Sequence, residues 1–198
     1  MSDITPTRSA VIELKEERRA MHEGYVFLDE KCLLLAGEIL AQLKRYGALS
    51  LAFASAHERA IAALEAAVGR HGLHGLQVYP ALDLSDAVLA HGSRSLMGVR
   101  LQEVELRIDD VTLPAAVNRS PEAEACRNAF SELLRQAAAL AALSGNLERL
   151  YLEYRRSVRR ARALQDVLLP EIDRTVYDIE TRLEEIEQED AIWTRQSV

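Results

Sequence analysis

Apolar residues recur at alternating steps of three and four along two long stretches of this chain, one near each end. Such steps average about 3.5 residues, the period of a left-handed coiled coil, and each stretch greatly exceeds an ordinary globular helix. A helix of roughly sixty residues, at ~1.5 Å per residue, is about 90 Å long. The pattern predicts an all-α dominated fold built on a long antiparallel two-helix coiled coil.

In each stretch the residues at these steps fall on one face of a helix and form a mainly apolar stripe, here called a seam. The first seam contains Val11, Leu14, Arg18, Met21, Tyr25, Leu28, Cys32, Leu35, Ile39, Gln42, Tyr46, Leu49, Phe53, Ala56, Ala60, Ala63 and Ala67. The second seam contains Leu133, Gln136, Leu140, Leu143, Leu147, Leu150, Tyr154, Ser157, Ala161, Leu164 and Leu168, then Ile172, Val176, Ile179, Leu183 and Ile186. Because the two long helices use most of the chain, we predict that residues 1–198 form one domain.

Each long helix has a start signal in which a hydroxyl residue precedes a proline. Thr5-Pro6 and Ser120-Pro121 both fit an N-cap followed by the first helical position, where the missing N–H of proline is harmless. Gly69 followed by Arg70-His71-Gly72 fits a C-terminal signal. We therefore predict a first helix over 6–69 and a second over 120–192.

Between the helices, 70–119 differ in character and are predicted to form a small α/β element at the distal tip. Leu76–Tyr79, which ends at Pro80, is typical of a short strand, and 82–91 fit either a short helix or a strand. Apolar residues alternate at Val99 and Leu101, and again from Val104 onward. The phase of the alternation changes between these two runs, which predicts a bulge or tight turn there and a β-hairpin in this region.

Pro170 lies inside the second helix, where proline removes a backbone hydrogen bond and costs about 3 kcal/mol. The seam changes at the same point from 3-4 to 4-4 spacing, which locally unwinds a supercoil. Together they predict a bend near 166–172. A complete break into two helices is the alternative.

Composition and motifs narrow the function classes. The net charge of −7 does not favour nucleic-acid binding. No apolar run approaches the length of a membrane span, because charged residues interrupt every candidate. The start of the chain lacks the hydrophobic region of a secretory signal, so we expect a cytoplasmic protein that reaches a membrane only through partners. No phosphate-binding, dinucleotide-binding or zinc-protease motif occurs. We expect no cofactor, no metal and no catalytic centre.

Individual histidines and cysteines fit structural roles better than chemical ones. His71 and His74 are three residues apart, a weak metal-ligand spacing without a carboxylate or cysteine nearby. Cys32 lies on the first seam as a small apolar residue, and Cys126 has no histidine or cysteine nearby. A disulfide between the two cysteines is not expected in a reducing compartment.

Two charged bands on the second helix, together with Pro170, are the candidate partner contacts. The basic band is Arg155, Arg156, Arg159, Arg160 and Arg162, and the acidic end, between Asp178 and Asp190, includes Glu184, Glu185 and Glu187. Such bands can be solvated faces with pairs inside the helix, or surfaces that meet different partners. The charge pattern alone leaves both the solvated-face and the partner-surface interpretations open.

Three sets of residues, in their order and spacing, resemble the D subunit of V-type and archaeal-type ATPases and ATP synthases. The first set is Pro6-Thr7-Arg8, Leu14-Lys15, Gly24, Leu28 and Lys31. The second, in the middle of the chain, is Met97-Gly98-Val99-Arg100, Glu103 and Glu105. The third is Arg159-Arg160, Ala163-Leu164, Val167–Pro170, Thr175, Ile179, Leu183–Glu185 and Glu187. The chain departs from the family pattern at Arg18, Cys32–Leu34, Gln102, Arg162 and Trp193–Arg195.

The resemblance implies a central rotor shaft, non-catalytic itself, that transmits torque between a catalytic hexamer and a membrane ion-translocating ring. Implied partners are the catalytic A/B-type hexamer, the small F subunit of the stalk and the socket subunit of the membrane ring. The paired helix ends, with the acidic end and the Pro170 bend, would lie within or near the hexamer. The competing interpretation is a free-standing coiled-coil scaffold or tether.

Overall fold

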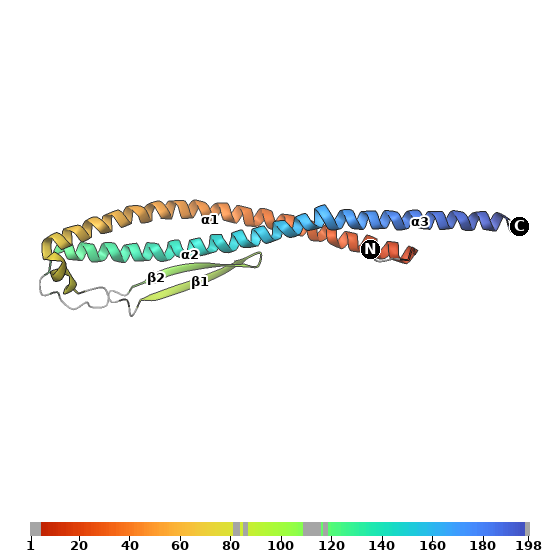
Figure 1. Ribbon diagram of the computed structural model, residues 1–198. Coiled ribbons are helices and arrows are strands. Elements are labelled where there is room, and N and C mark those ends of the chain that lie inside the picture. Colours follow the sequence, from red (N-terminus) through yellow and green to blue (C-terminus); the bar gives the residue numbers. More distant parts are fainter. Residues whose placement is uncertain (1–4, 81–83, 85–86, 109–115, 117–118, 197–198) are drawn as a thin grey trace. The chain divides into compact units, whose positions relative to one another are not determined.

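The computed structural model describes residues 5–80, 84, 87–108, 116 and 119–196. Its elements are α1 Arg8–Gln77, β1 Val88–Leu96, β2 Val99–Arg107, α2 Pro121–Ala163, the π-helical turn η1 Leu164–Leu168, and α3 Leu169–Gln196 (Figure 1). Long N-terminal and C-terminal helices with one antiparallel pair of strands confirm the predicted fold class.

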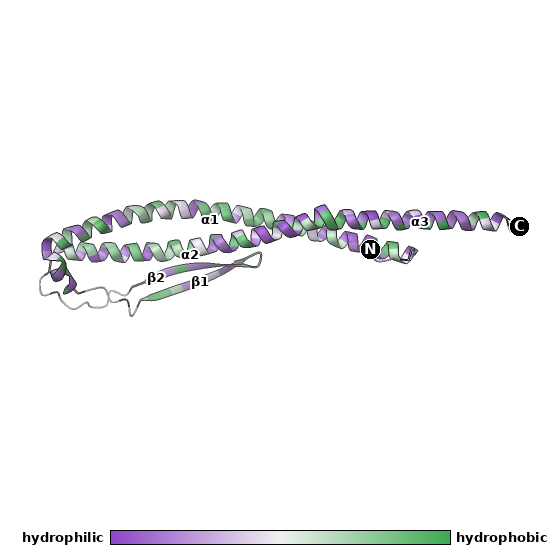
Figure 2. Cartoon of the chain, viewed as in Figure 1, coloured by the Kyte–Doolittle hydropathy of each residue, from purple (hydrophilic) through white to green (hydrophobic). Residues whose placement is uncertain are grey.

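The chain divides into two compact units. Met1–Leu34 and Glu153–Val198 form the first, here called the paired-ends unit, and Leu35–Leu152 form the second, the hairpin unit. In the paired-ends unit, the first part of α1 lies antiparallel to the end of α2, η1 and α3. The hairpin unit contains the rest of α1 and α2 together with β1 and β2. Hydrophobic and hydrophilic residues are interspersed along the long helices (Figure 2).

Burial follows the two predicted seams. Every first-seam side chain except Arg18 is buried or half-buried, and in the second seam only Leu168 and Ile186 are exposed. Arg18 instead places its guanidinium Nε 2.7 Å from a carboxylate oxygen of Asp173. The core of the paired-ends unit is made by Val11, Cys32, Ala161, Ile172, Val176 and Ile179. Cys32 is therefore the small buried residue that the seam predicts.

The two helix starts have different outcomes. At α2, Ser120 Oγ accepts the N–H of Ala123 at 3.2 Å and its C=O accepts the N–H of Glu124, so the predicted N-cap is confirmed. At α1 the prediction of Thr5 is wrong: the helix begins at Arg8, and Thr7 Oγ1 accepts the N–H of Ala10 at 3.2 Å. Pro6 precedes the cap instead of following it, because a second capping residue stands two positions later.

The end of α1 also differs from the prediction. Gly69 stays helical, and the break comes at Gly72, whose φ of 68° and ψ of 165° are readily adopted only by glycine. Helix resumes as far as Gln77, so the predicted strand at Leu76–Tyr79 is wrong. The His71 ring lies 5.8 Å from the Tyr79 ring, and its Nε2 lies 2.5 Å from the Ser120 hydroxyl at the start of α2.

The β-hairpin is present, but its partner strand and turn differ from the prediction. β1 pairs with β2 in unbroken antiparallel register from Val88↔Arg107 to Leu96↔Val99. The predicted bulge between Leu101 and Val104 is absent, because the register runs straight through it. Of the alternatives for 82–91, the described part from Val88 is strand; 82–83 and 85–86 lie outside the described residues.

The turn is the two-residue loop Met97-Gly98, with φ of 48° and 83°. Positive φ at both positions is the geometry of the tight hairpin turns that match strand twist. The shift in the apolar alternation between Leu101 and Val104 instead shows that the two halves of β2 carry their apolar side chains on opposite faces of the hairpin. Val99 and Leu101 are buried, whereas Val104 and Leu106 on the opposite side are half-exposed.

Around Pro170 the helix is irregular but continuous. Leu169 donates its N–H to the C=O of Leu164, five residues back, and both Ala163 and Leu169 have right-handed helical dihedral angles. A proline ring collides with the carbonyl four residues before it in a regular α-helix, and the wider π-turn immediately before Pro170 makes room for it. The helical backbone is not interrupted, which argues against the complete break. The size of any bend stays a prediction.

Candidate functional site

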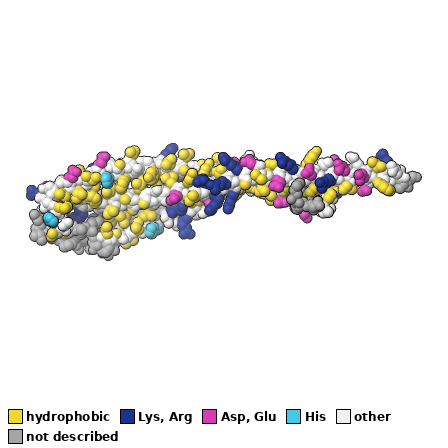
Figure 3. Space-filling view, in the orientation of Figure 1, with side chains coloured by type: hydrophobic (Ala, Val, Ile, Leu, Met, Phe, Trp, Pro, Cys, Tyr) yellow, Lys and Arg dark blue, Asp and Glu magenta, His cyan; other side chains and the backbone are white. Residues whose placement is uncertain are grey.

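The basic band lies on α2 where that helix enters the paired-ends unit. Arg155, Arg156, Arg159, Arg160 and Arg162 are all exposed, whereas the seam residues interspersed with them, Tyr154, Ser157 and Ala161, are buried or half-buried. At about 100° per residue the arginines occupy the helix face opposite the seam. Dark blue side chains gather over this part of α2 in Figure 3. The band is therefore a one-sided basic surface.

Glu153, just before the basic band on α2, contacts both α1 and one arginine of the band. Its Oε1 lies 2.7 Å from Lys31 Nζ, and its Oε2 lies 3.4 Å from Arg156. The Lys31 and Glu153 side chains are only 15% and 22% exposed. The hydrogen bond from Lys31 lowers the pKa of Glu153 below its usual value, and the nearby charges of Lys31, Arg156 and Arg160 lower it further. This ion pair joins α1 to α2 under the arginines.

The acidic end lies on α3, where Glu184, Glu185 and Glu187 are exposed. Glu187 is not directed only outward, because its carboxylate pairs with the Arg8 guanidinium of α1. Glu180, one turn before Glu184, pairs with Lys15 at 2.6 Å instead of with a neighbour on its own helix. Part of the acidic end thus pairs with cationic side chains of α1, whereas Glu184 and Glu185 are exposed on the surface of α3.

Pro170 lies between the two bands, half-buried at the start of α3. The π-turn before it brings Leu164 against α1, where a Cβ added at Gly24 would lie 3.8 Å from the Leu164 Cδ1. Leu168, the last residue of the turn, is 39% exposed although the seam predicts burial. The seam residue in the π-turn therefore departs from the predicted burial, whereas Ile172, Val176 and Ile179 after it are buried again.

The β-hairpin is fastened to the helices by polar contacts that the sequence analysis did not identify. Asn146 on α2 accepts the backbone N–H of Gln102 at 2.8 Å and donates to its C=O at 2.7 Å. Arg94 on β1 pairs with Glu38 on α1. The only sequence signal was Asn146 itself, a polar residue beside an apolar seam, and that pattern does not name the partner strand.

Metal-binding and membrane-spanning features are absent from the part of the chain that the structure describes. Among these residues, no three histidine, cysteine, aspartate or glutamate side chains converge as a metal site. Cys32 and Cys126 are both free thiols. No helix in the described ranges has the length and apolar character needed to span a membrane.

Comparison with known proteins identifies the family. Residues 10–195 match the family model described as the D subunit of ATP synthase. The V-type ATP synthase D subunit of Thermotoga neapolitana is 24% identical over 94% of this chain and 93% of its own length. The A-type ATP synthase D subunit of Methanosphaera stadtmanae is 28% identical over 96% and 90%. That of Methanopyrus kandleri is 25% identical over 97% and 84%. The chain, matched along almost its whole length, belongs to the family of ATP synthase D subunits.

Proposed function

We propose that this chain is the central-stalk rotor subunit of a V/A-type rotary ATPase or ATP synthase. In this role it transmits torque between the catalytic hexamer and the membrane ion-translocating ring. The observation that carries the proposal is the antiparallel pairing of the two chain ends within one compact unit. Membership of the family of ATP synthase D subunits supports it. The same membership does not favour the free-standing scaffold or tether.

A rotor shaft must turn without its two helices sliding past each other or unwinding. In the paired-ends unit, apolar side chains from both helices interlock, with Val11 of α1 and Val176 and Ile179 of α3 buried. Ion pairs flank this core, including Lys15 with Glu180 and the partly buried Lys31 with Glu153. Two packed helices resist twisting better than one, because each side chain is held in a hole formed by the facing helix.

A rotor shaft must also have an asymmetric surface, so that the contacts it makes with the surrounding stationary subunits change with its rotation angle. The basic band provides this asymmetry, because its arginines occupy only the helix face opposite the seam. A rotating charged face presents itself to each stationary subunit in turn. Differential contact with that face shifts the balance between the open and closed states of the subunit. In this proposal Arg155, Arg156, Arg159 and Arg160 lie nearer the middle of the shaft than the acidic end and contact acidic surfaces of partner subunits.

The acidic end and Pro170 have a related role in this proposal. Glu184 and Glu185 are exposed on α3 close to the ion pair of Arg8 with Glu187, which joins the two chain ends. We place this end and the Pro170 π-turn within or near the hexamer. The bend there would let the tip of the shaft press against one side of the bore. These contacts are inferred from the charge pattern and the family.

The proposal assigns the remaining partners by their roles in such a complex. The chain itself is not catalytic, and the hexamer of A/B-type subunits carries out ATP chemistry. The small F subunit of the stalk lies beside the shaft, and the socket subunit of the membrane ring receives the end opposite the hexamer. The chain is cytoplasmic and meets the membrane only through these partners.

A carbodiimide cross-linking experiment tests the carrying observation. The reagent joins an amine directly to a carboxylate that already touches it, and the chain has three lysines, Lys15, Lys31 and Lys44. We expect Lys15–Glu180 and Lys31–Glu153 linkages within single chains, read by mass spectrometry after digestion. Lys15→Met and Lys31→Met are the matched controls, each of which must remove only its own linkage. Linkages found only between two copies would refute the antiparallel pairing within one chain.

A second experiment tests the assembly. The chain is co-expressed with the hexamer and small stalk subunits from the same genome, and the mass of the purified complex is measured. We expect one copy of the chain in a complex with the hexamer. A stable homodimer that binds neither set of subunits would instead support the scaffold and overturn the proposal.

A further inference from the structure

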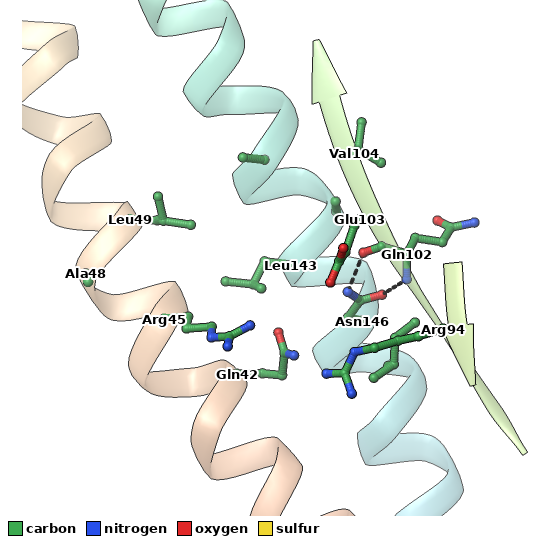
Figure 4. Close-up of a pocket in the computed structure, with 13 residues that line it drawn as sticks. Gln42, Arg45, Ala48, Leu49, Arg94, Gln102, Glu103, Val104, Leu143 and Asn146 are labelled. Atoms are coloured by element: carbon green, nitrogen blue, oxygen red, sulfur yellow. Dashed lines mark hydrogen bonds between the residues drawn. The ribbon is translucent and has the colours of Figure 1, made fainter. Parts of the chain in front are cut away.

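The hairpin unit contains a pocket of about 420 Å³ between α1, α2 and β2 (Figure 4). Leu49, Ala142 and Leu143 form apolar walls, and Gln42 and Arg45 add polar groups from α1. This volume lies within the range of small-ligand sites, which combine apolar walls with a few polar groups that fix orientation. The pocket is separate from the charged bands, all of which belong to the paired-ends unit.

Gln42 has an unsatisfied carbonyl at this pocket. Its side chain is buried, with only 3% of the residue exposed, and its Nε2 donates to Glu38 Oε1 at 2.6 Å. Gln42 Oε1 is buried and has no hydrogen-bond partner among the described residues. Figure 4 shows this amide directed into the pocket, with the guanidinium of Arg45 beside it. A buried acceptor without a partner has lost its hydrogen bonds to water and gained none in exchange, so a donor that enters the pocket would be favoured there.

The orientation of the Gln42 amide is fixed by chemistry. A hydrogen bond from Gln42 lowers the pKa of Glu38, and the Arg94 guanidinium lowers it further, so the carboxylate is ionised and can only accept. The NH₂ group of Gln42 must therefore face Glu38, and the carbonyl must face the pocket. The free group at the pocket is an acceptor that requires an N–H or O–H donor.

The edge of β2 adds the complementary groups. Asn146 pairs with both the N–H and the C=O of Gln102, so the backbone groups of Gln102 point away from β1. Residues two apart on a strand present their backbone groups to the same edge. Val104 therefore presents its N–H and C=O to this edge, and it lines the pocket. Asn146 already shows that an amide fits this edge.

We propose that the pocket is a binding slot for one further amide group carried on an apolar stem. The amide N–H would donate to Gln42 Oε1, its carbonyl would accept the Val104 N–H, and the stem would lie against Leu49 and Leu143. Such a group comes either from a peptide segment of a partner subunit or from a free small molecule. The slot itself is independent of the rotor role, because every group that forms it belongs to the hairpin unit. The choice of a partner subunit as the source of the amide rests on the proposed function.

The test uses N-acetyl-leucinamide, which carries amides on a leucine stem, as the probe. The probe is titrated into the full-length ¹⁵N-labelled chain, and amide chemical shifts are followed by NMR. We expect saturable shifts at Val104, Ala142 and Leu143. Absence of saturable shifts at these residues, or shifts spread evenly over the helices, would overturn the proposal.

Two variants show whether the slot groups are responsible. Gln42→Met removes the carbonyl and keeps the shape of the side chain. Gln136→Met is the matched control, because Gln136 also donates to a glutamate four residues back and has a buried, unpartnered Oε1, yet it does not line the pocket. We expect Gln42→Met to weaken probe binding at least tenfold and Gln136→Met to change it less than twofold. Equal effects would overturn the proposal.

A backbone variant keeps the test valid if Gln42→Met fails to fold. Val104→Pro removes an N–H that points away from β1, so the hairpin keeps its own hydrogen bonds. We expect this variant also to weaken the probe at least tenfold, and unchanged affinity would overturn the proposed pairing. The titration is then repeated on the chain bound to its small stalk subunit. If the bound subunit abolishes binding of N-acetyl-leucinamide, the slot is assigned to a segment of that partner. If the probe still binds, the slot is assigned to a free small molecule.

Discussion

Replacement of Lys31 by methionine is expected to weaken the paired-ends unit specifically at the border of the basic band. Methionine keeps the apolar stem of lysine but removes the ammonium group, whose Nζ lies 2.7 Å from Glu153 Oε1. Both side chains are less than a quarter exposed, so the solvent replaces this bond poorly. A hydrogen bond between charged groups contributes about 1.5–3 kcal/mol. Because Arg156 still contacts Glu153 at 3.4 Å, we expect a loss of about 2 kcal/mol, toward the lower end of that range.

The assay is urea unfolding of the full chain followed by circular dichroism, in a double-mutant cycle with Glu153→Gln. The matched control is Lys15→Met, because Lys15 and Glu180 form an equally short pair at 2.6 Å whose side chains are 53% and 42% exposed. Exposed pairs contribute about 0–1 kcal/mol and are screened by salt. We expect Lys31→Met to cost at least twice as much as Lys15→Met.

The effect of Lys31→Met should depend on pH in a defined direction. Lys31 holds the pKa of Glu153 in the folded chain below its value in the unfolded chain. The stability that the pair contributes is therefore complete above the unfolded pKa, about 4.3 for a glutamate, and is lost as the pH falls through the folded pKa. The destabilisation should shrink as the solution is acidified through this window. Equal losses in the two lysine variants, or a loss that does not change with pH, would refute the reasoning.

Three further outcomes follow from the same structure. Asn146→Ala removes two hydrogen bonds to the Gln102 backbone, and we expect about thirtyfold faster hydrogen exchange at the Gln102 amide, corresponding to about 2 kcal/mol, with α3 unaffected. Gly98→Val forces a β-branched residue into a φ of 83°, and calorimetric unfolding should show a loss of about 1–2 kcal/mol, whereas no loss would contradict the turn. Pro170→Ala restores a backbone N–H after the π-turn, and in the assembled complex we expect fewer ions moved per ATP hydrolysed; unchanged coupling would argue against a functional bend.

The long helices were predictable because the period of a seam decides which side chains face the neighbouring helix, with Arg18, Leu168 and Ile186 as the exposed exceptions. The Ser120 cap was equally readable, since a hydroxyl followed by proline and acidic residues leaves few other interpretations. Thr5 and Thr7 offered two caps two residues apart, and Gly69 and Gly72 offered two helix ends three residues apart. The choice within each pair depends on backbone geometry that a pattern of residue types does not determine.

The hairpin was only partly predictable. β1 contains Gly92, Ser93 and Ser95 and is exposed along most of its length, so it lacks the alternation that identifies a strand. Its pairing is instead determined by the Met97-Gly98 turn and by contacts with distant helices, such as Arg94 with Glu38. Asn146 could not be assigned for the same reason, because its partner is backbone, and any residue at 102 other than proline presents the same groups.

Rotation itself is the most direct test of the proposed function. A single probe can be attached at Ser95→Cys, an exposed hairpin position, because both native cysteines are buried. The hexamer of the assembled complex is fixed to a surface, and the probe is observed by single-molecule microscopy during ATP hydrolysis. We predict continuous rotation in one direction that stops when ATP is removed. A probe that holds a fixed angle to the hexamer while ATP is being hydrolysed would contradict the rotor assignment.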